Sequence, residues 1–243
     1  AAPAVAASLR EPFHVVTRPL FNATESYATY IVPAVLVLIL QQTQLVGVGL
    51  IAGTRRERER ERTMAAAGLL TRPGPAAALL RVAGRTAFYV LLYGVYALLY
   101  FGVIFPFEGF AVRSPAADLA WFTLPYLLAA TMLAQALGAF FTDRETAMFA
   151  IVWTSLPAVF LAGFAWPREA MPAWTVVLGQ FLPSTAAIDG VLRLTQLGAR
   201  LGDVSRQITV LWALAGAYGA LAVLLEWWRA GRGRDQVRPA ASA

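Results

Sequence analysis

The sequence predicts an all-α, polytopic helical membrane protein, and two observations carry that prediction. The 243 residues are 58% hydrophobic and only 14% charged, whereas soluble domains are nearer a quarter charged. The charged residues also gather in short islands between apolar stretches of about twenty residues. That is the length a helix needs to cross a hydrocarbon core of roughly 30 Å. We therefore expect a bundle of membrane-spanning helices joined by polar segments.

Five spanning helices are expected, and together they make up one transmembrane domain over residues 29–228. They are Thr29–Gly53, Thr86–Phe105, Asp118–Phe141, Ala147–Trp166 and Ile208–Trp228. The first is typical of the set. Tyr27 and Tyr30 stand at its start, where aromatic rings favour the head-group level, and Arg55 and Arg56 follow its end.

The arginines predict the orientation of the bundle. All 20 basic residues are arginine, and thirteen of them fall in the segment 54–85, at Arg144 or in the tail after Trp228. The other seven arginines fall in the segments expected on the opposite side of the membrane. Because cytoplasmic segments carry the excess of basic residues, we expect residues 54–85 and the basic tail 229–243 in the cytoplasm. Residues 1–28 are expected outside, as the end of an exterior segment.

The segment 54–85 opens with an alternating tract, GTRRERERERTM, from Gly53 to Met64. A nucleic-acid patch, a solvated linker and a working cytoplasmic loop are its three possible meanings. Five arginines against three glutamates leave a net charge of only +2, and no aromatic residues interleave with them. Nucleic-acid binding is therefore not expected. The simplest interpretation is a solvated loop that obeys the charge rule.

The exterior segment 167–207, between the last two expected spans, contains only short apolar pieces. Each is about a dozen residues or fewer, too short to cross a membrane, and Pro172 and Pro183 punctuate them. We expect re-entrant or interfacial helices that cover the outer end of the bundle.

Polar residues inside the first expected span need partners. Gln41, Gln42, Thr43 and Gln44 cover a full helical turn, so they cannot all avoid lipid by choosing one face. Two interpretations are open for these residues. The slightly favoured one is that they form hydrogen bonds between helices, and the other is that they line a path for a substrate. Gly49-x-x-x-Gly53 follows on the same helix and is a common signal of close helix packing.

Several kinds of chemistry lack the residues they need. There is one histidine, His14, and no cysteine, so neither a multi-histidine metal site nor thiol catalysis is expected. Without lysine the chain has no P-loop of its own. We predict no catalytic residues and no metal or cofactor bound by this chain. Asp143, in the expected turn TDRET, is best explained as a helix cap.

The segment Phe160–Leu194 resembles the type-2 ATP-binding-cassette (ABC) exporter permeases. Its sequence, FLAGFAWPREAMPAWTVVLGQFLPSTAAIDGVLRL, is similar to a block that these permeases carry before their last helix. The matching positions include Gly163, Pro167, Met171, Pro172, Pro183 and Arg193. The tract RERERTMAAAGLLTRPGPAAALLRVAGR resembles their cytoplasmic segment, and the likeness extends over nearly the whole chain from about Asn22.

The resemblance implies the membrane subunit of a bacterial ABC exporter in the inner membrane, which moves a hydrophobic or amphipathic substrate outward. It implies two partners besides membrane lipid: an ATPase subunit that binds ATP and magnesium, and a second permease copy of the same or a different kind. The family has six spans, so a first helix and most of an exterior domain are expected to be absent from this sequence. The segment expected to dock on the ATPase consists of Arg55, Arg56, Arg58, Glu59, Arg60, Glu61, Arg62 and Thr63.

Two alternatives stay open. A polytopic enzyme acting on lipid would need convergent acid, base or nucleophilic groups, for which Asp189, Arg193 and Asp203 are the candidates. A non-catalytic membrane scaffold or channel subunit would need none of these.

Overall fold

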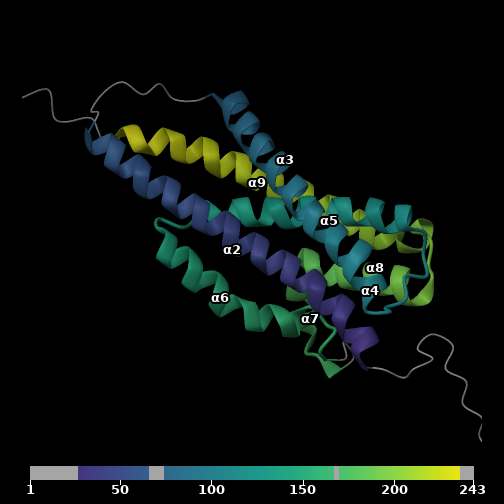
Figure 1. Ribbon diagram of the computed structural model, residues 1–243. Helices are drawn as coiled ribbons and strands as arrows, with labels where there is room; N and C mark the ends of the chain where they lie inside the picture. Colours follow the sequence, from purple (N-terminus) through teal and green to yellow (C-terminus); the bar gives the residue numbers. More distant parts are fainter. Residues whose placement is uncertain (1–26, 66–73, 167–169, 236–243) are drawn as a thin grey trace, which may run out of the picture.

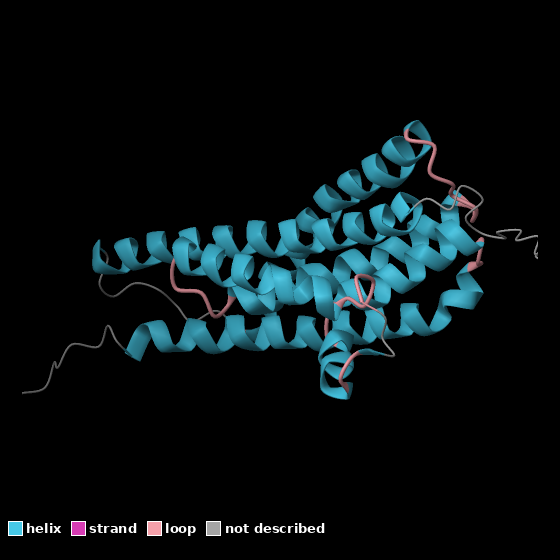
Figure 2. Ribbon diagram, turned by 90° about the horizontal axis from the view of Figure 1, so that it is seen from below, coloured by secondary structure: helices cyan, strands magenta, loops and turns pink. Residues whose placement is uncertain are grey.

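The computed structural model describes residues 27–65, 74–166 and 170–235, and in these residues it is helical, with no strand (Figure 2). The elements are α2 (Tyr27–Ala65), α3 (Pro75–Leu98), the π-helix η1 (Leu99–Ile104), α4 (Phe105–Phe107), α5 (Ala116–Gly138), α6 (Arg144–Leu161), α7 (Ala173–Gln180), α8 (Pro183–Leu197), the 3₁₀-helix η3 (Leu201–Val204) and α9 (Ser205–Asp235). The long helices lie along one another as a bundle (Figure 1). The predicted all-α fold class is confirmed.

Four helical segments in the described part of the chain are long and apolar enough to cross a membrane. They are Ala28–Arg58, Pro75–Phe107, Ala116–Gly138 and Leu201–Arg229. The consecutive helices α7 and α8, bent by 86°, are together apolar enough to form a fifth, broken span or a re-entrant loop. Four predicted spans therefore coincide with four long helices, and the short helices expected before the last span are present as α7 and α8.

The predicted span Ala147–Trp166 is not among those four. It forms α6, which ends at Leu161 and begins with Arg144 and Glu145, so its 18 residues are shorter and more polar than expected. At 1.5 Å per residue α6 is about 27 Å long. It nevertheless runs beside α2 from one end of the bundle to the other, since Glu57 contacts Arg144 and the Tyr30 hydroxyl donates to the Phe164 carbonyl.

The predicted end of the first span at Gly53 is wrong, because α2 continues as a helix to Ala65. Arginine and glutamate are good helix formers, and no proline interrupts the tract. Residues 54–65, the first part of the segment expected to be a loop, are therefore helical. The next helix also begins earlier than expected, at Pro75 rather than Thr86, with Gly74 as its N-cap. Proline is favoured at the first position of a helix because its missing N–H would have no partner there.

Helix α5 lies at the centre of the bundle and packs against α2, α3, α8 and α9 (Figure 1). Its small residues Ala129, Ala130 and Ala134 are almost fully buried, which lets neighbouring backbones approach closely. The ring of Phe122 packs directly on Gly190 of α8, where any side chain would collide with it. Close approach at small residues therefore helps to set the positions of these helices.

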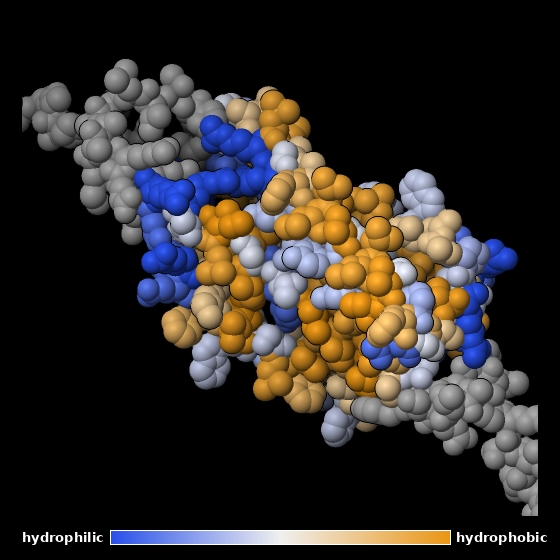
Figure 3. Space-filling view, in the orientation of Figure 1, coloured by the Kyte–Doolittle hydropathy of each residue, from blue (hydrophilic) through white to orange (hydrophobic). Residues whose placement is uncertain are grey.

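Large apolar side chains cover the outside of the bundle. Leu80, Leu91 and Trp153 are each more than 70% exposed, far more apolar surface than a soluble monomer shows. In Figure 3 the middle of the molecule is hydrophobic, while hydrophilic residues gather over the ends of α2 and α9 at one side and at the opposite edge. This banding fits a protein whose waist lies in hydrocarbon.

Candidate functional site

The candidate site is the end of the bundle where α2 extends past the apolar waist. The 39 residues of α2 span about 58 Å, roughly twice the thickness of a hydrocarbon core. Its last part carries the arginine–glutamate tract. Arg55 and Arg58 are exposed there. Arg56 is half-buried. The side chains of Glu59, Arg60, Glu61, Arg62 and Thr63 lie outside the part of the structure that is described, although their backbone is helical.

Helix α2 meets the start of α6 at Gly53. A Cβ placed on Gly53 would lie 2.6 Å from the backbone nitrogen of Arg144 and from the backbone carbon and oxygen of Asp143. One turn earlier, a Cβ on Gly49 would lie 2.8 Å from the Ile151 side chain. Gly49-x-x-x-Gly53 is therefore the face of α2 that receives α6, and at Gly53, where the opposing atoms are backbone, only glycine permits this approach.

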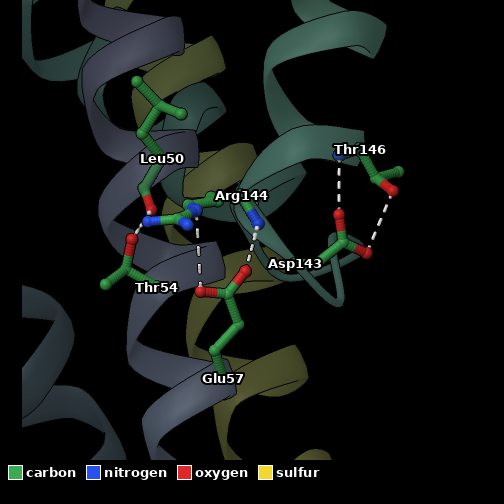
Figure 4. A network of polar contacts seen from close by, with 6 residues as sticks. All are labelled: Leu50, Thr54, Glu57, Asp143, Arg144 and Thr146. Atoms are coloured by element: carbon green, nitrogen blue, oxygen red, sulfur yellow. Dashed lines mark hydrogen bonds and ion pairs between the residues drawn. The ribbon is translucent and has the colours of Figure 1, made fainter.

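Glu57 fastens the two helices one turn further along (Figure 4). Its Oε1 accepts a hydrogen bond of 3.1 Å from the backbone N–H of Arg144, at the exposed start of α6. Its Oε2 lies 3.9 Å from the Arg144 guanidinium. A carboxylate at a helix N-terminus is favourable because the first N–H groups have no partner within the helix.

Asp143 is the residue directly before α6 and caps that helix, as the sequence predicted (Figure 4). Its Oδ1 accepts a 2.7 Å hydrogen bond from the backbone N–H of Thr146, and its Oδ2 accepts from the hydroxyls of Thr142 and Thr146. These bonds, the backbone one foremost, lower the pKa of Asp143 below its usual value. Two carboxylates, Glu57 and Asp143, thus hold the first turn of α6.

A second ion pair crosses the bundle at the same end. The Arg85 guanidinium of α3 lies 3.0 Å from a carboxylate oxygen of Glu226 in α9, and both side chains are about three-quarters buried. Beside the pair is a cavity of about 30 Å³, lined also by Arg55 and Gln135, with room for about one water molecule. The partners are far apart in sequence, and sequence reasoning did not pair them.

The glutamines of α2 mostly point into the bundle. Gln41 and Gln44 are fully buried. The Gln41 Oε1 accepts from the backbone N–H of Ser184 in α8 at 2.7 Å, and the Gln44 Nε2 donates to the Thr131 hydroxyl of α5 at 2.5 Å. Thr43 is exposed and bonds to its own helix, at the carbonyl of Ile39. Gln42 is half-buried. Two of the four predicted residues therefore join neighbouring helices.

The positions that match the block of the permease family lie at the other end of the bundle, away from the arginine–glutamate tract. Gly163 ends α6 with a positive φ of 76°, a conformation that glycine adopts without strain. Pro172 precedes α7, and Pro183 begins α8. Met171 lies immediately before Pro172, and Pro167 falls outside the described residues. Arg193 pairs with Asp189 at 3.0 Å on one face of α8.

The candidates for acid–base chemistry are engaged in other contacts. Asp189 accepts from Arg193 through one oxygen and from Gln207 through the other. Asp203 accepts from the backbone N–H of Arg200 at 2.8 Å and caps η3. In the described part of the chain, no group of three histidine, cysteine or acidic residues is placed to hold a metal ion.

Comparison with known proteins gives one match that covers most of the chain. The model of a family described as ABC-2 family transporter protein matches residues 2–224. No curated protein matches the chain.

Proposed function

The chain belongs to the ABC-2 family of transporter proteins, and from that premise we propose that it works as the permease of an ATP-driven exporter. Membership makes it a multi-pass membrane permease of an ABC transporter. The proposal adds direction and cargo: a hydrophobic or amphipathic substrate moves outward across a bacterial inner membrane. It also adds orientation, with the charged end of α2 and the C-terminus in the cytoplasm, as the arginine distribution favours.

The observation that supports this proposal is the close contact between the charged end of α2 and the start of α6. Gly53 brings the two backbones into contact, and Glu57 bonds to the first N–H of α6. A protein docked on the exposed residues Arg55 and Arg58 would therefore displace two helices together. Two helices moved as one body are a means of converting an external movement into a change of the bundle.

The docking partner is proposed to be a separate ATPase subunit that binds ATP and magnesium. This chain has no lysine and thus no P-loop lysine of its own. The alternating charges of the tract suit recognition, because complementary charges fix register and association rate more than raw affinity. A second permease copy completes the proposed assembly.

The test replaces four tract residues together: Arg58, Glu59, Arg60 and Glu61 by alanine. Alanine is the best helix former, so α2 stays helical while the charges are lost. In vesicles that contain the permease and its co-purified ATPase, we expect the variant to insert normally, to lose most export, and to retain ATP hydrolysis no longer stimulated by the permease.

A matched control exchanges the order of the charges: Arg58→Glu, Glu59→Arg, Arg60→Glu and Glu61→Arg. Net charge and helix propensity are unchanged, but each charge is inverted in place. If register matters, this variant also loses coupling. A second control, Glu108→Ala, removes an exposed charge at the opposite end and should leave coupling intact. Full ATP-driven export by the four-alanine variant would refute the docking role.

A further inference from the structure

A hollow of about 490 Å³ opens at the end of the bundle where α2 begins. The segment after α6, helix α8, η3 and the start of α9 form its walls, with Tyr30 of α2 beside them. One wall is charged and carries Asp189, Arg193, Asp203 and Arg206. This end is opposite the tract on α2, so the hollow is separate from the proposed docking site.

The four charged side chains in the hollow differ in how many partners they have. Asp189 and Arg193 neutralise each other at 3.0 Å, and the second Asp189 oxygen accepts from Gln207. In the part of the chain that the structure describes, Asp203 accepts through its Oδ2, from the N–H of Arg200, and no contact of its Oδ1 is seen. Among the described residues Arg206 forms no ion pair, and it does not reach Asp203 within 4.0 Å. The hollow therefore has no net charge, but it offers one free carboxylate oxygen and one free guanidinium at separate places.

The other wall of the hollow is apolar. Phe164, Ile188 and Leu192 line it, and Tyr30 stands at its edge. Trp166, two residues beyond Phe164, is 53% exposed. Tyrosine and tryptophan are enriched where a membrane meets water. The hollow thus combines a polar half with an apolar half at the level where amphipathic molecules place their head groups.

We propose that this hollow binds a zwitterionic head group that carries a phosphate and a primary ammonium, on an amphipathic molecule. The phosphate pairs with Arg206, assisted by the free N–H groups of Arg193, because guanidinium groups suit phosphate oxygens. The ammonium donates to the free oxygen of Asp203. The apolar part lies along Phe164 and Leu192. A ligand of one sign would leave either Asp203 or Arg206 unpaired, so the neutral lining favours a zwitterion.

The test measures lipid preference in nanodiscs. Spin-labelled phosphatidylethanolamine and phosphatidylglycerol are compared for association with the purified full chain, since both carry a phosphate but only the first carries an ammonium. Asp203→Asn should weaken phosphatidylethanolamine binding about three-fold, the size typical of a partly exposed ion pair, and leave phosphatidylglycerol binding unchanged. Arg206→Gln should weaken both lipids by a similar factor.

Controls separate recognition from damage to the fold. Asparagine keeps the Oδ acceptor for the Arg200 N–H, so Asp203→Asn leaves the cap of η3 in place, which an unchanged unfolding temperature would verify. Glu108→Gln removes an exposed charge elsewhere at the same end and should not alter either lipid. Equal losses of both lipids in Asp203→Asn, or no loss in either variant, would overturn the proposal.

The same head-group chemistry can come from the surrounding bilayer or from transported cargo, and a second arm distinguishes these sources. Fluorescent phosphatidylethanolamine is followed in vesicles that hold the permease and its ATPase. ATP-driven movement of the probe between leaflets, reduced in Arg206→Gln, identifies cargo. Association without movement identifies a resident lipid. The nanodisc measurement uses neither ATP nor the ATPase, so it stands even if the proposed export function fails.

Discussion

A single missing side chain, at Gly53, allows α2 and α6 to touch. The backbone of Asp143 and Arg144 occupies the place where a Cβ would lie, and backbone cannot move aside as the end of a long side chain can. Glu57 then adds a hydrogen bond to an N–H that would otherwise lack a partner. Contact and bond together determine how α6 starts.

We predict that Gly53→Ala destabilises the protein by about 1–3 kcal/mol, the usual cost of overfilling a packed site. The added methyl group would push the start of α6 away from α2. Tryptophan fluorescence during thermal unfolding in detergent measures the effect. The matched control is Gly84→Ala in α3, where a Cβ meets nothing within 4 Å. There the change should be neutral or stabilising by up to about 1 kcal/mol. Equal destabilisation by both variants would contradict the prediction.

The cap at Asp143 predicts a dependence on pH. Because the folded state lowers the pKa of Asp143 from 3.8, the ionised carboxylate stabilises the protein fully above that unfolded value. This stabilisation is lost as the pH falls through the lower, folded pKa. Asp143→Ala should therefore unfold at a lower temperature than the natural protein at neutral pH, and the difference should shrink below about pH 4.

Asp143→Asn is the control for this cap, since asparagine is an equally good N-cap residue that does not titrate. Asp143→Asn should be more stable than Asp143→Ala. The difference in stability between these two variants should vary little with pH, because neither side chain titrates. A gap between the natural protein and Asp143→Ala that stays constant down to acidic pH would contradict the role of the carboxylate charge.

Sequence reasoning reached some of these residues and missed others for a physical reason. Asp143 was predicted as a cap because capping is local: the acceptor and the donated N–H are three residues apart. Glu57 was not singled out, because within the tract it resembles Glu59 and Glu61. Only the approach of a distant turn at Gly53 makes Glu57 different.

At the scale of the helix, the apolar runs were enough to predict that α2, α3, α5 and α9 exist, but they did not predict where these helices end. Hydrophobicity stops at the membrane surface, whereas a helix stops where its residues no longer favour it. The arginine–glutamate tract is polar yet strongly helix-forming. The sequence therefore predicts the end of the first span at Gly53, although the helix continues to Ala65.

Helices α2 and α5 are joined by the Gln44–Thr131 hydrogen bond, and we predict a measurable coupling between these residues. In a double-mutant cycle of Gln44→Leu and Thr131→Val, the coupling should be about 0.6 kcal/mol, the mean for hydrogen bonds between membrane helices. Reversible unfolding in mixed micelles provides the free energies. As a control, the cycle of Gln44→Leu with Thr154→Val should show no coupling, because among the described residues Thr154 of α6 bonds to carbonyls of its own helix. Equal coupling in both cycles would count against a direct bond.

For the molecule as a whole, the proposed orientation can be tested directly because the chain contains no cysteine. Arg58→Cys and Glu108→Cys each introduce one thiol, at exposed positions on opposite ends of the bundle. In intact cells we expect a membrane-impermeant maleimide to label the thiol at position 108. The thiol at position 58 should be labelled only after the membrane is opened. The natural chain should take up no label, and the reverse pattern would overturn the orientation.

The assembly of the bundle was the least predictable level from sequence. Polar residues such as Gln41 and Gln44 were expected to need partners, but the partners Ser184 and Thr131 follow from how three helices are rotated against one another. The ion pair between Arg85 and Glu226 depends on α3 and α9 meeting at one end. Such contacts require the close approach of small residues along α5, which periodicity alone does not reveal.

The length of α2 has a mechanical consequence. If α2 and α6 turn together about a point at Gly53, the arm of α2 to Ala65 is about 18 Å and its arm to Tyr30 is about 35 Å. A rigid lever with these arms doubles displacement: a push of about 1 Å at the short arm swings the far tip by about 2 Å. Under the proposed docking role, a small displacement of the charged end of α2 would therefore become a larger displacement of the end at Tyr30.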